Sequence, residues 1–250
     1  MTKRLHNKYA LITGGTAGIG LETAKQFQLE GATIAVTGRN ETGLVDAQAL
    51  LGNQALVLKS DACNVEQQAE LAQRLMDEFP KLDIVYINAG DVTHKPLEDW
   101  DETSFDQVMN TNLKGPFFLI QSLLPLLSDS ASIILCGSVS AQIGLAQSSV
   151  YAASKAGLIS LARTLSGELK DRGIRVNSIS PGPTQTDAFN KFGLSKEKRE
   201  ALIEEVKALV PLKRMGSPWE LAQAAVFMAS DESAYMLGSE LLIDGGVGNL

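Results

Sequence analysis

The sequence has 250 residues, a formal net charge of −7 at pH 7, 44% hydrophobic residues and 20% charged residues. A chain of this length and composition can form one hydrophobic core that offsets the entropy lost on folding, so we expect a single domain over residues 1–250 without extended disorder. The acidic balance excludes a surface adapted throughout to nucleic acid.

The two cysteines, Cys63 and Cys136, stand apart, without the spacing of a disulfide framework or a zinc site. The apolar run at residues 9–12 is too short for the core of a signal peptide. No stretch approaches the about 18 consecutive apolar residues of a membrane-spanning helix. We therefore expect a cytoplasmic protein with no bound metal, no nucleic-acid partner and no membrane partner.

Short apolar runs alternate with longer segments of helical spacing, as in a parallel sheet covered by helices. Strands are predicted over residues 9–13, 33–37, 55–59, 84–88, 132–136, 175–179 and 240–244. Helices are predicted over 18–30, 41–51, 65–79, 103–127, 149–172, 196–209 and 218–229. Because the strands are almost continuously apolar, both faces of the sheet are expected under helices. The pattern predicts an α/β, doubly wound (Rossmann) fold with a seven-stranded, mostly parallel sheet.

The predicted helices 103–127 and 149–172 are unusually poor in charge. Residues 105–127, for example, contain only Asp106 and Lys114 as charged residues. Burial against the sheet explains one apolar face, but surface helices rarely lack charge on the other. We therefore expect a homo-oligomer, a tetramer or a dimer, formed through these two helices.

Residues 184–210 interrupt the strand and helix rhythm with a loop and an amphipathic helix. A segment of this kind can form a mobile lid over a ligand cleft, which is how we interpret it. An ordinary insertion helix on the edge of the sheet explains the same pattern.

The first predicted strand is followed by a glycine-rich turn, Thr13-Gly14-Gly15-Thr16-Ala17-Gly18-Ile19-Gly20. Backbone N–H groups and the helix dipole at such a turn favour a pyrophosphate. The second strand ends in Thr37-Gly38-Arg39-Asn40, where an NAD site would place a carboxylate against the ribose. Because Arg39 can instead bind a 2′-phosphate, we expect NADP(H) as the preferred coenzyme and NAD(H) as the alternative.

Tyr151 and Lys155 are four residues apart near the start of an apolar predicted helix, so they share one face. A fixed cation beside a tyrosine stabilises the phenolate, which allows the tyrosine to exchange protons near neutral pH. Ser138 follows the fifth predicted strand, at the sheet edge where open α/β sheets bind ligands. Its hydroxyl could hold a carbonyl oxygen beside Tyr151. The sequence contains only two histidines and no Gly-x-Ser-x-Gly elbow, so hydrolase chemistry is disfavoured.

Taken together, these motifs resemble the short-chain dehydrogenase/reductase family, in its single-domain branch, over essentially the whole chain. The resemblance rests on the glycine-rich turn, Asn88-Ala89-Gly90, Asn112, Ser138, the Tyr151 and Lys155 pair, and Pro181-Gly182. It implies that Tyr151 is the general acid/base, that Ser138 orients the substrate oxygen and that Lys155 lowers the tyrosine pKa. It also implies that Asn112 holds a water that connects Lys155 to a proton path.

The resemblance and the motifs together define the predicted ligand residues. The coenzyme residues are Gly14, Thr16, Gly18, Ile19, Gly20, Arg39, Asn40, Asp61, Ala62, Asn88, Ala89, Gly90, Tyr151, Lys155, Pro181, Gly182, Thr184 and Thr186. The substrate residues are Ser138, Gln142, Tyr151 and Phe189, in a mainly apolar pocket formed by residues 91–96, 139–147 and the lid.

Two positions depart from the family pattern. Ala17 stands where many NADP-dependent relatives have a basic residue, so the 2′-phosphate assignment rests mainly on Arg39. Ile87 replaces the first asparagine of the usual Asn-Asn-Ala-Gly stretch, which removes one polar contact.

The sequence thus predicts an NADP(H)-dependent oxidoreductase that transfers a hydride reversibly between the nicotinamide and a small-molecule ketone or secondary alcohol. One alternative is a 3-oxoacyl-[acyl-carrier-protein] reductase, with Lys191, Lys196, Lys198 and Arg199 as a docking patch. Glutamates interrupt that patch, however, which is more typical of a solvated mixed-charge helix. A coenzyme-binding sensor without catalysis is the alternative from another class.

Overall fold

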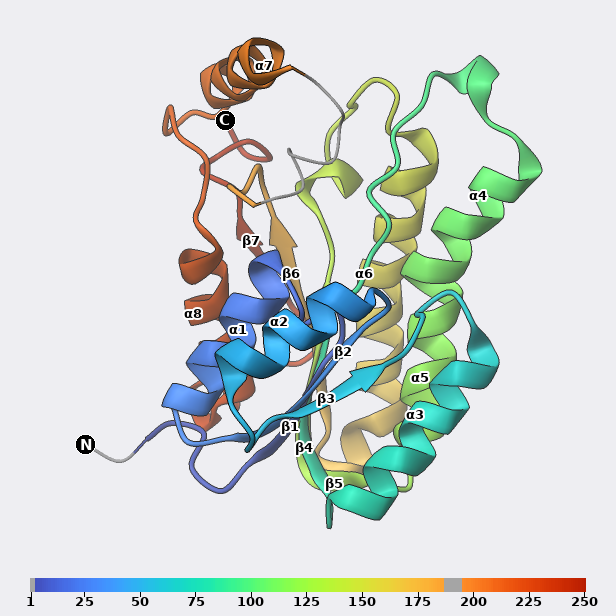
Figure 1. Cartoon of the computed structure of the whole chain (residues 1–250), viewed down its shortest axis with the longest axis vertical. Helices are drawn as coiled ribbons and strands as arrows, with labels where there is room; N and C mark the ends of the chain where they lie inside the picture. Colours follow the sequence, from blue (N-terminus) through green and yellow to red (C-terminus); the bar gives the residue numbers. More distant parts are fainter. Residues whose placement is uncertain (1–2, 187–194) are drawn as a thin grey trace.

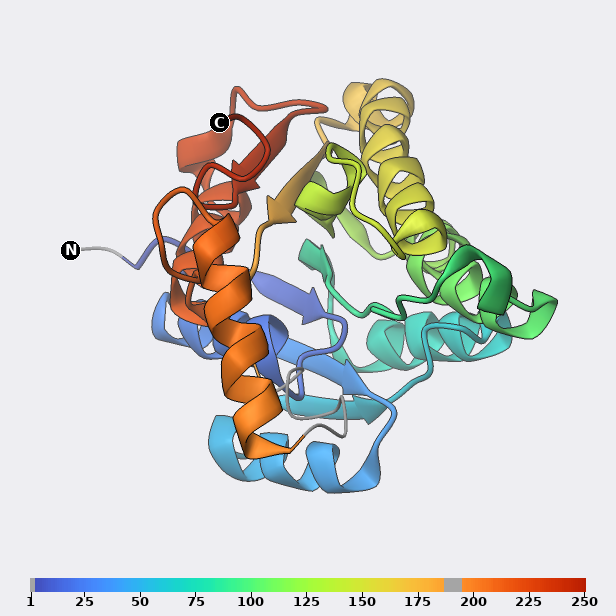
Figure 2. The ribbon, with the colours of Figure 1, turned by 90° about the horizontal axis from the view of Figure 1, so that it is seen from above.

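The computed structural model describes residues 3–186 and 195–250 and contains a seven-stranded sheet in the order β3-β2-β1-β4-β5-β6-β7 (Figure 1). The strands are β1 (Tyr9–Ile12), β2 (Thr33–Gly38), β3 (Leu56–Lys59), β4 (Leu82–Ile87), β5 (Leu127–Cys136), β6 (Arg175–Pro181) and β7 (Glu240–Ile243). Every neighbouring pair is parallel, which confirms the predicted sheet. All strands therefore end at one edge, which Figure 2 views from above.

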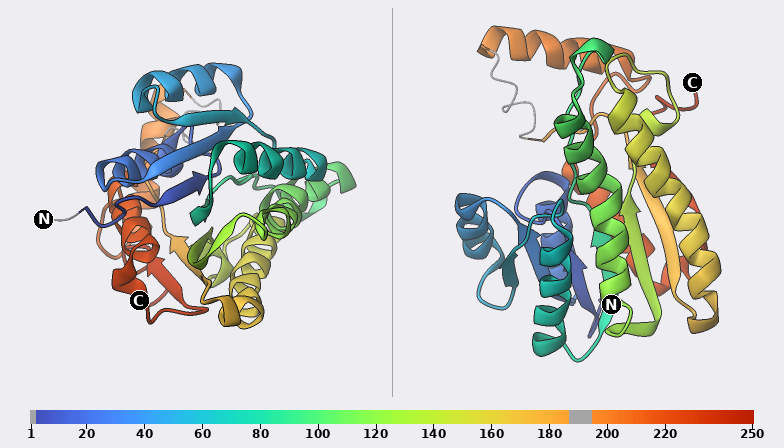
Figure 3. Two further views of the ribbon diagram at one scale, coloured as in Figure 1. Left: turned by 90° about the horizontal axis from the view of Figure 1, so that it is seen from below. Right: turned by 90° about the vertical axis from the view of Figure 1, so that its right-hand side faces the viewer.

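Helices cover both faces of the sheet, as Figure 3 shows. They are α1 (Gly18–Leu29), α2 (Glu41–Leu51), α3 (Val65–Glu78), α4 (Glu102–Met109), α5 (Gly115–Leu123), α6 (Ser149–Leu169), α7 (Lys196–Leu209) and α8 (Pro218–Ala229). Short 3-10 turns are η1 (Leu97–Asp99), η3 (Val139–Ala141), η4 (Lys170–Arg172) and η6 (Asp231–Ser233). Neighbouring residues of β1 belong to opposite cores: Leu11 packs with α3, α5 and α6, and Ile12 packs with α1, α2 and α8. Burial on both faces explains the continuous apolarity of the strands.

The helix predicted over residues 103–127 is wrong in its interior and at its end. The helical run covers Glu102 to Leu123 but contains one π-helical turn, η2 (Asn110–Lys114). In an α-helix the carbonyl of Asn112 would accept a hydrogen bond from residue 116, which is Pro116 and has no N–H. The run ends at Leu123, and Pro125 has no N–H that could continue the helix by donating to the carbonyl of Gln121.

Strand ends differ from the prediction by a few residues, most of all at β5. This strand begins at Leu127, five residues before the predicted start at Ser132, and a register irregularity lies opposite it between Leu82 and Ile84. Asn88, predicted as the last residue of a strand, lies just outside β4. Because residues 128–130 are polar, the apolar pattern of the sequence does not predict the first half of β5.

Strand β1 lies between β2 and β4, so the chain moves outward in one direction up to β3 and in the other from β4 to β7. Such a reversal opens a crevice at the carboxyl ends of the strands, where open α/β sheets bind ligands. Helix α7, predicted over residues 196–209, lies above this edge (Figure 1) and has no buried residue. At the base of the segment that carries α7, Gln185 and Gly216 share a 2.8 Å backbone hydrogen bond.

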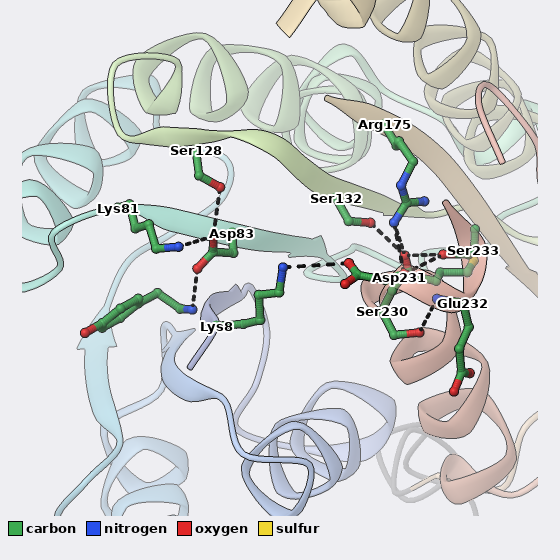
Figure 4. Close-up of polar contacts among 12 residues, drawn as sticks. Lys8, Lys81, Asp83, Ser128, Ser132, Arg175, Ser230, Asp231, Glu232 and Ser233 are labelled. Carbon is green, nitrogen blue, oxygen red and sulfur yellow. Dashed lines mark hydrogen bonds and ion pairs between the residues drawn. The ribbon is translucent and has the colours of Figure 1, made fainter. Parts of the chain in front are cut away.

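A polar network holds the amino ends of the strands, opposite the crevice (Figure 4). The Asp83 carboxylate accepts hydrogen bonds from the Tyr9 backbone N–H, the Lys81 ammonium and the Ser128 hydroxyl, at 2.8–2.9 Å. Burial opposes ionisation, but these donors together hold the pKa of Asp83 below its usual value. The Tyr9 and Ser128 contacts tie β1 and β5 to β4.

Over residues 3–186 and 195–250, no helix has the length and apolarity to cross a membrane.

Candidate active site

The turn between β1 and α1 brings backbone segments so close together that glycine is required. Gly14 and Gly18 have positive φ angles of 64° and 54°, a region that a Cβ disfavours. A Cβ on Gly20 would lie 2.3 Å from the carbonyl oxygen of Gly14 and 2.5 Å from Nδ2 of Asn88. Main-chain atoms therefore form the surface at the start of α1, where the helix dipole favours a phosphate.

Thr13 and Asn88 join the carboxyl ends of β1 and β4. The Thr13 hydroxyl oxygen accepts hydrogen bonds from the backbone N–H groups of Asn88 (2.9 Å) and Ala89 (3.0 Å). Nδ2 of Asn88 in turn donates to the carbonyls of Thr13 (3.1 Å) and Gly14 (3.3 Å). The Asn88 side chain thus holds the glycine-rich turn in place from the neighbouring strand.

A cleft of about 280 Å³ opens beside this turn. Its lining includes nine of the predicted coenzyme residues: Gly14, Thr16, Arg39, Asn40, Asp61, Ala62, Asn88, Ala89 and Gly90. It also includes Ala17, Thr37, Gly38, Ser60 and Thr111, which the sequence analysis did not assign as ligands. The only sequence signal for Ser60 and Thr111 is that each directly precedes a predicted site residue.

One end of this cleft carries Gly38 and Arg39, on which the predicted preference for NADP(H) over NAD(H) rests. Gly38 packs so closely on Thr16 that a Cβ would lie 2.6 Å from its Cγ2, so a larger residue at this position would require the Thr16 side chain to move. Arg39 is exposed and has no ion-pair partner within the described ranges. The neighbouring acidic residue, Glu41, forms an ion pair with Lys59. Positive charge is therefore available at this end of the cleft.

Tyr151 and Lys155 lie one turn apart on α6 and are almost fully buried, with 9% and 4% of their surfaces exposed. The Lys155 ammonium lies 5.8 Å from the centre of the Tyr151 ring and donates a 2.6 Å hydrogen bond to the carbonyl of Cys136. A Cβ built on Gly90 would lie 3.4 Å from the ammonium. Because Gly90 lines the cleft, Lys155 lies close behind that part of its wall.

Ser138 lies two residues beyond the end of β5 and begins the turn η3, where its hydroxyl oxygen accepts a 3.1 Å hydrogen bond from the Ser140 N–H. This turn packs against α6, the helix that carries Tyr151. Gln142 follows the same turn, and a Cβ on Gly248 would lie 3.8 Å from its Oε1. The C-terminal segment therefore packs beside this predicted substrate residue.

The Asn112 side chain, which lies in the π-helical turn, connects three parts of the site. Its Oδ1 accepts a 2.7 Å hydrogen bond from the Asp91 N–H, and its Nδ2 donates to the Asp91 carbonyl at 2.9 Å. Nδ2 also donates to the Ser154 hydroxyl at 3.0 Å. The side-chain amide is thus fully engaged with protein atoms, and the main-chain carbonyl of Asn112 lacks its α-helical donor because residue 116 is proline.

Of the remaining predicted residues, Ile19 lies partly buried in α1, Pro181 is the last residue of β6, and Gly182, Thr184 and Thr186 follow that strand. A Cβ on Gly18 would lie 3.4 Å from Cγ2 of Thr186, so the segment 184–186 approaches the glycine-rich turn. Gly182 packs directly on Asp244, where a Cβ would lie 2.5 Å from Cα. Phe189, the predicted substrate residue of the lid, lies outside the described residues.

His94 is not among the predicted site residues, although it lies in the segment 91–96 that is predicted to line the substrate pocket. Its imidazole packs on the Tyr151 ring, with centroids 5.1 Å apart and planes inclined by 58°. Desolvation by the surrounding residues lowers the pKa of His94 from its usual value, which favours the neutral ring at pH 7. A lone histidine in a loop has no pattern that could have identified it.

Several known proteins are similar to this chain over nearly its whole length. A family model described as enoyl-(acyl carrier protein) reductase matches residues 14–248. The chain is 39% identical to oxidoreductase asL5 of Sarocladium schorii, over 99% of this chain and 98% of that protein. It is 36% identical to the 3-oxoacyl-[acyl-carrier-protein] reductase FabG of Thermotoga maritima, over 98% and 99% of the two chains.

Solved structures with the same fold cover nearly the full chain. A short-chain dehydrogenase/reductase family protein superposes with a TM-score of 0.86 at 35% identity, over 99% of this chain and 100% of its own. A blue fluorescent protein from a metagenomic library, crystallised in complex with NADPH, superposes with a TM-score of 0.89 at 29% identity, over 98% and 99% of the chains. From its first strand to its last, the chain therefore belongs to the short-chain dehydrogenase/reductase family of oxidoreductases.

Proposed function

We propose that this protein is an NADP(H)-dependent oxidoreductase that interconverts a ketone and a secondary alcohol, with Tyr151 as its general acid/base. The observation that carries the proposal is the approach of Lys155 to Gly90. It connects the buried Tyr151 and Lys155 pair to the cleft beside the glycine-rich turn. A proton donor beside a crevice at the carboxyl ends of the strands matches carbonyl reduction.

The cleft fits a nicotinamide dinucleotide because Gly14 in its lining presents bare main chain, in a turn whose close packing leaves no room for a Cβ at Gly14 or Gly20. The turn from Gly14 to Gly20 would hold the pyrophosphate, Asp61 and Ala62 the adenine, and Ala89 and Gly90 the adjoining ribose. When bound, the reduced coenzyme supplies the hydride that the carbonyl carbon accepts. Arg39 would bind the 2′-phosphate, and the NADPH complex of a structural neighbour supports that choice.

Tyr151 donates its phenolic proton to the carbonyl oxygen as the alcohol forms. Lys155 stabilises the resulting phenolate with its positive charge, at a buried position where charges interact strongly. Ser138 donates a hydrogen bond to the same substrate oxygen and so stabilises the negative charge that develops there. The main-chain carbonyl of Asn112, whose α-helical donor is missing at Pro116, would hold a water that returns a proton towards Lys155.

The decisive variant is Tyr151→Phe, which removes the hydroxyl and keeps the ring. We expect turnover to fall at least about a hundredfold while calorimetric affinity for NADPH stays nearly intact. Tyr235→Phe, at a fully exposed tyrosine, is the matched control and should retain wild-type turnover. Wild-type turnover in Tyr151→Phe would refute the assignment.

A second candidate, a 3-oxoacyl-[acyl-carrier-protein] reductase, is favoured by the reductase name of the Thermotoga relative and by the matching family model. The mixed charges of α7, where Lys196 lies near Glu200 and Lys207 near Glu204, give no continuous basic docking surface. We therefore propose free small-molecule carbonyl compounds as the substrates. Comparison of carrier-bound and free 3-oxoacyl substrates at equal concentration separates the two.

We also propose that the protein forms a homo-oligomer through the helical run 102–123 and α6. An open, mainly apolar groove of about 690 Å³ lies between these helices, lined by residues that include Leu113, Phe117 and Gly157. Phe117 remains 39% exposed in one chain, and a second copy could cover it. Light scattering after size exclusion should report a dimer or tetramer for wild type and smaller species for Phe117→Glu.

A further inference from the structure

The loop that follows Gly90 is hydrogen-bonded to neighbouring segments at several points. Its start is held by two hydrogen bonds between the Asp91 main chain and the Asn112 side chain, at 2.7 Å and 2.9 Å. Further along, the Lys95 N–H donates to the Gln147 carbonyl at 3.0 Å, and the Trp100 indole donates to the Lys95 carbonyl at 3.2 Å. The loop is therefore fixed on both sides of His94.

His94 is placed by these anchors but forms no hydrogen bond of its own within residues 3–186 and 195–250. Its contact is the Tyr151 ring, 5.1 Å away between centroids, and the residue as a whole stays exposed. The nearby Lys95 ammonium is directed elsewhere, 5.4 Å from the Trp100 ring and 3.8 Å from the Asp101 carboxylate. An imidazole with an uncommitted N–H thus lies beside the proposed proton donor.

We propose that His94 is a specificity-determining residue that donates a hydrogen bond to a second oxygen of the substrate. This inference rests on the proposed function, because Tyr151 and Ser138 there hold the oxygen that is reduced. The substrate class that places a second oxygen beside the first is a 3-oxo ester or thioester, in which a single methylene separates the two carbonyl groups. His94 would bind the ester carbonyl and orient the ketone towards Tyr151.

A simple ketone has no second oxygen that could accept a hydrogen bond from His94. The imidazole would therefore favour a 3-oxo ester or thioester over a simple ketone of similar size. The expected discrimination is that of one hydrogen bond, about fivefold to tenfold in kcat/KM. A neutral ring suits this role because it can donate through one nitrogen and does not attract anions in general.

Nuclear magnetic resonance of the imidazole nitrogens tests the contact without turnover. The chain has only two histidines, so His6 serves as an internal reference in protein labelled with ¹⁵N at histidine. With NADP⁺ present, ethyl acetoacetate cannot be reduced and should shift the His94 resonances, whereas 2-hexanone should leave them in place. Equal shifts with both ketones, or no shift with either, would overturn the inference.

Steady-state kinetics of two variants provide a second test of the proposed role of His94. His94→Phe keeps an aromatic ring on Tyr151 and should lower kcat/KM for ethyl acetoacetate about fivefold to tenfold, with 2-hexanone changed less than about twofold. His94→Gln restores a donor and should recover most of the loss. A parallel fall with both ketones would show a structural role and sink the inference. If wild type reduces neither ketone, the proposed function fails, and the resonance titration still decides the role of His94.

Discussion

Asn112 donates a 3.0 Å hydrogen bond to Ser154, and the Ser154 hydroxyl donates in turn to the carbonyl of Tyr151 at 2.7 Å. The contact joins the π-helical turn to α6 at the residue before Lys155. Both side chains are fully buried, at 1% and 0% exposure. The position of α6 therefore depends on an amide 42 residues earlier in the chain.

Asn112→Ala should destabilise the protein strongly. The substitution removes three hydrogen bonds and leaves the Asp91 main chain and the Ser154 hydroxyl without their buried partner. We expect a loss of about 3 kcal/mol in the free energy of unfolding, measured by urea denaturation. Ser154→Ala removes only one hydroxyl and should cost about 1 kcal/mol. Equal losses in the two variants would contradict this account of Asn112.

Arg39→Ala should change coenzyme preference. Loss of the guanidinium should weaken NADPH binding by about tenfold to a hundredfold, because a hydrogen-bonded charge pair is lost, and should leave NADH binding within about twofold. Isothermal calorimetry with each coenzyme measures both affinities. Arg74→Ala, at an exposed arginine that pairs with Glu78, is the control for a change in net charge. Equal weakening of NADPH and NADH would refute a 2′-phosphate contact.

Gly20→Ala and Gly167→Ala should have opposite effects, although both glycines lie in helices. A Cβ at Gly20 meets the Gly14 carbonyl oxygen at 2.3 Å, so the turn must move, whereas nothing lies within 4 Å of a Cβ at Gly167. Gly167→Ala should raise stability by up to about 1 kcal/mol, from helix propensity. Gly20→Ala should lower it by about 2 kcal/mol or more and weaken coenzyme binding. Thermal unfolding and coenzyme titration measure both effects.

Asp83 should make stability depend on pH under acidic conditions. Although burial opposes its ionisation, its donors lower the folded-state pKa below the usual 3.8. The unfolded chain therefore binds more protons in this range. The stability from Asp83 is present in full above pH 3.8 and disappears as the pH falls through the lower folded-state pKa.

Comparison of wild type with Asp83→Asn isolates this effect. The difference in unfolding free energy should be about 2 kcal/mol at pH 7 and should shrink below the unfolded-state pKa. Urea unfolding across the acidic range measures it. Asp77→Asn, at an exposed helical position, is the control. A difference that grows as the pH falls would contradict the assigned direction of the pKa shift.

The seven strands and the covering helices could be predicted because their signals are local. Continuous apolar runs mark strands that are buried on both faces, and a helix such as α7 shows its own spacing and begins after Ser195, which caps it. The glycine-rich turn after the first strand could also be predicted from local sequence, because its main chain packs so closely that residues with a Cβ do not fit there. The pair Tyr151 and Lys155 was visible because four residues make one helical turn.

Tertiary structure alone decided the features that depend on residues far apart in the chain. The π-helical turn within residues 102–123 brings Asn112 to Asp91 and Ser154, and helical spacing does not reveal which helices will exchange hydrogen bonds. His94 reaches Tyr151 only because its loop is anchored on Asn112 and Gln147. A single polar residue in a loop has no period, so packing between distant segments is what gives it a place beside the proposed proton donor.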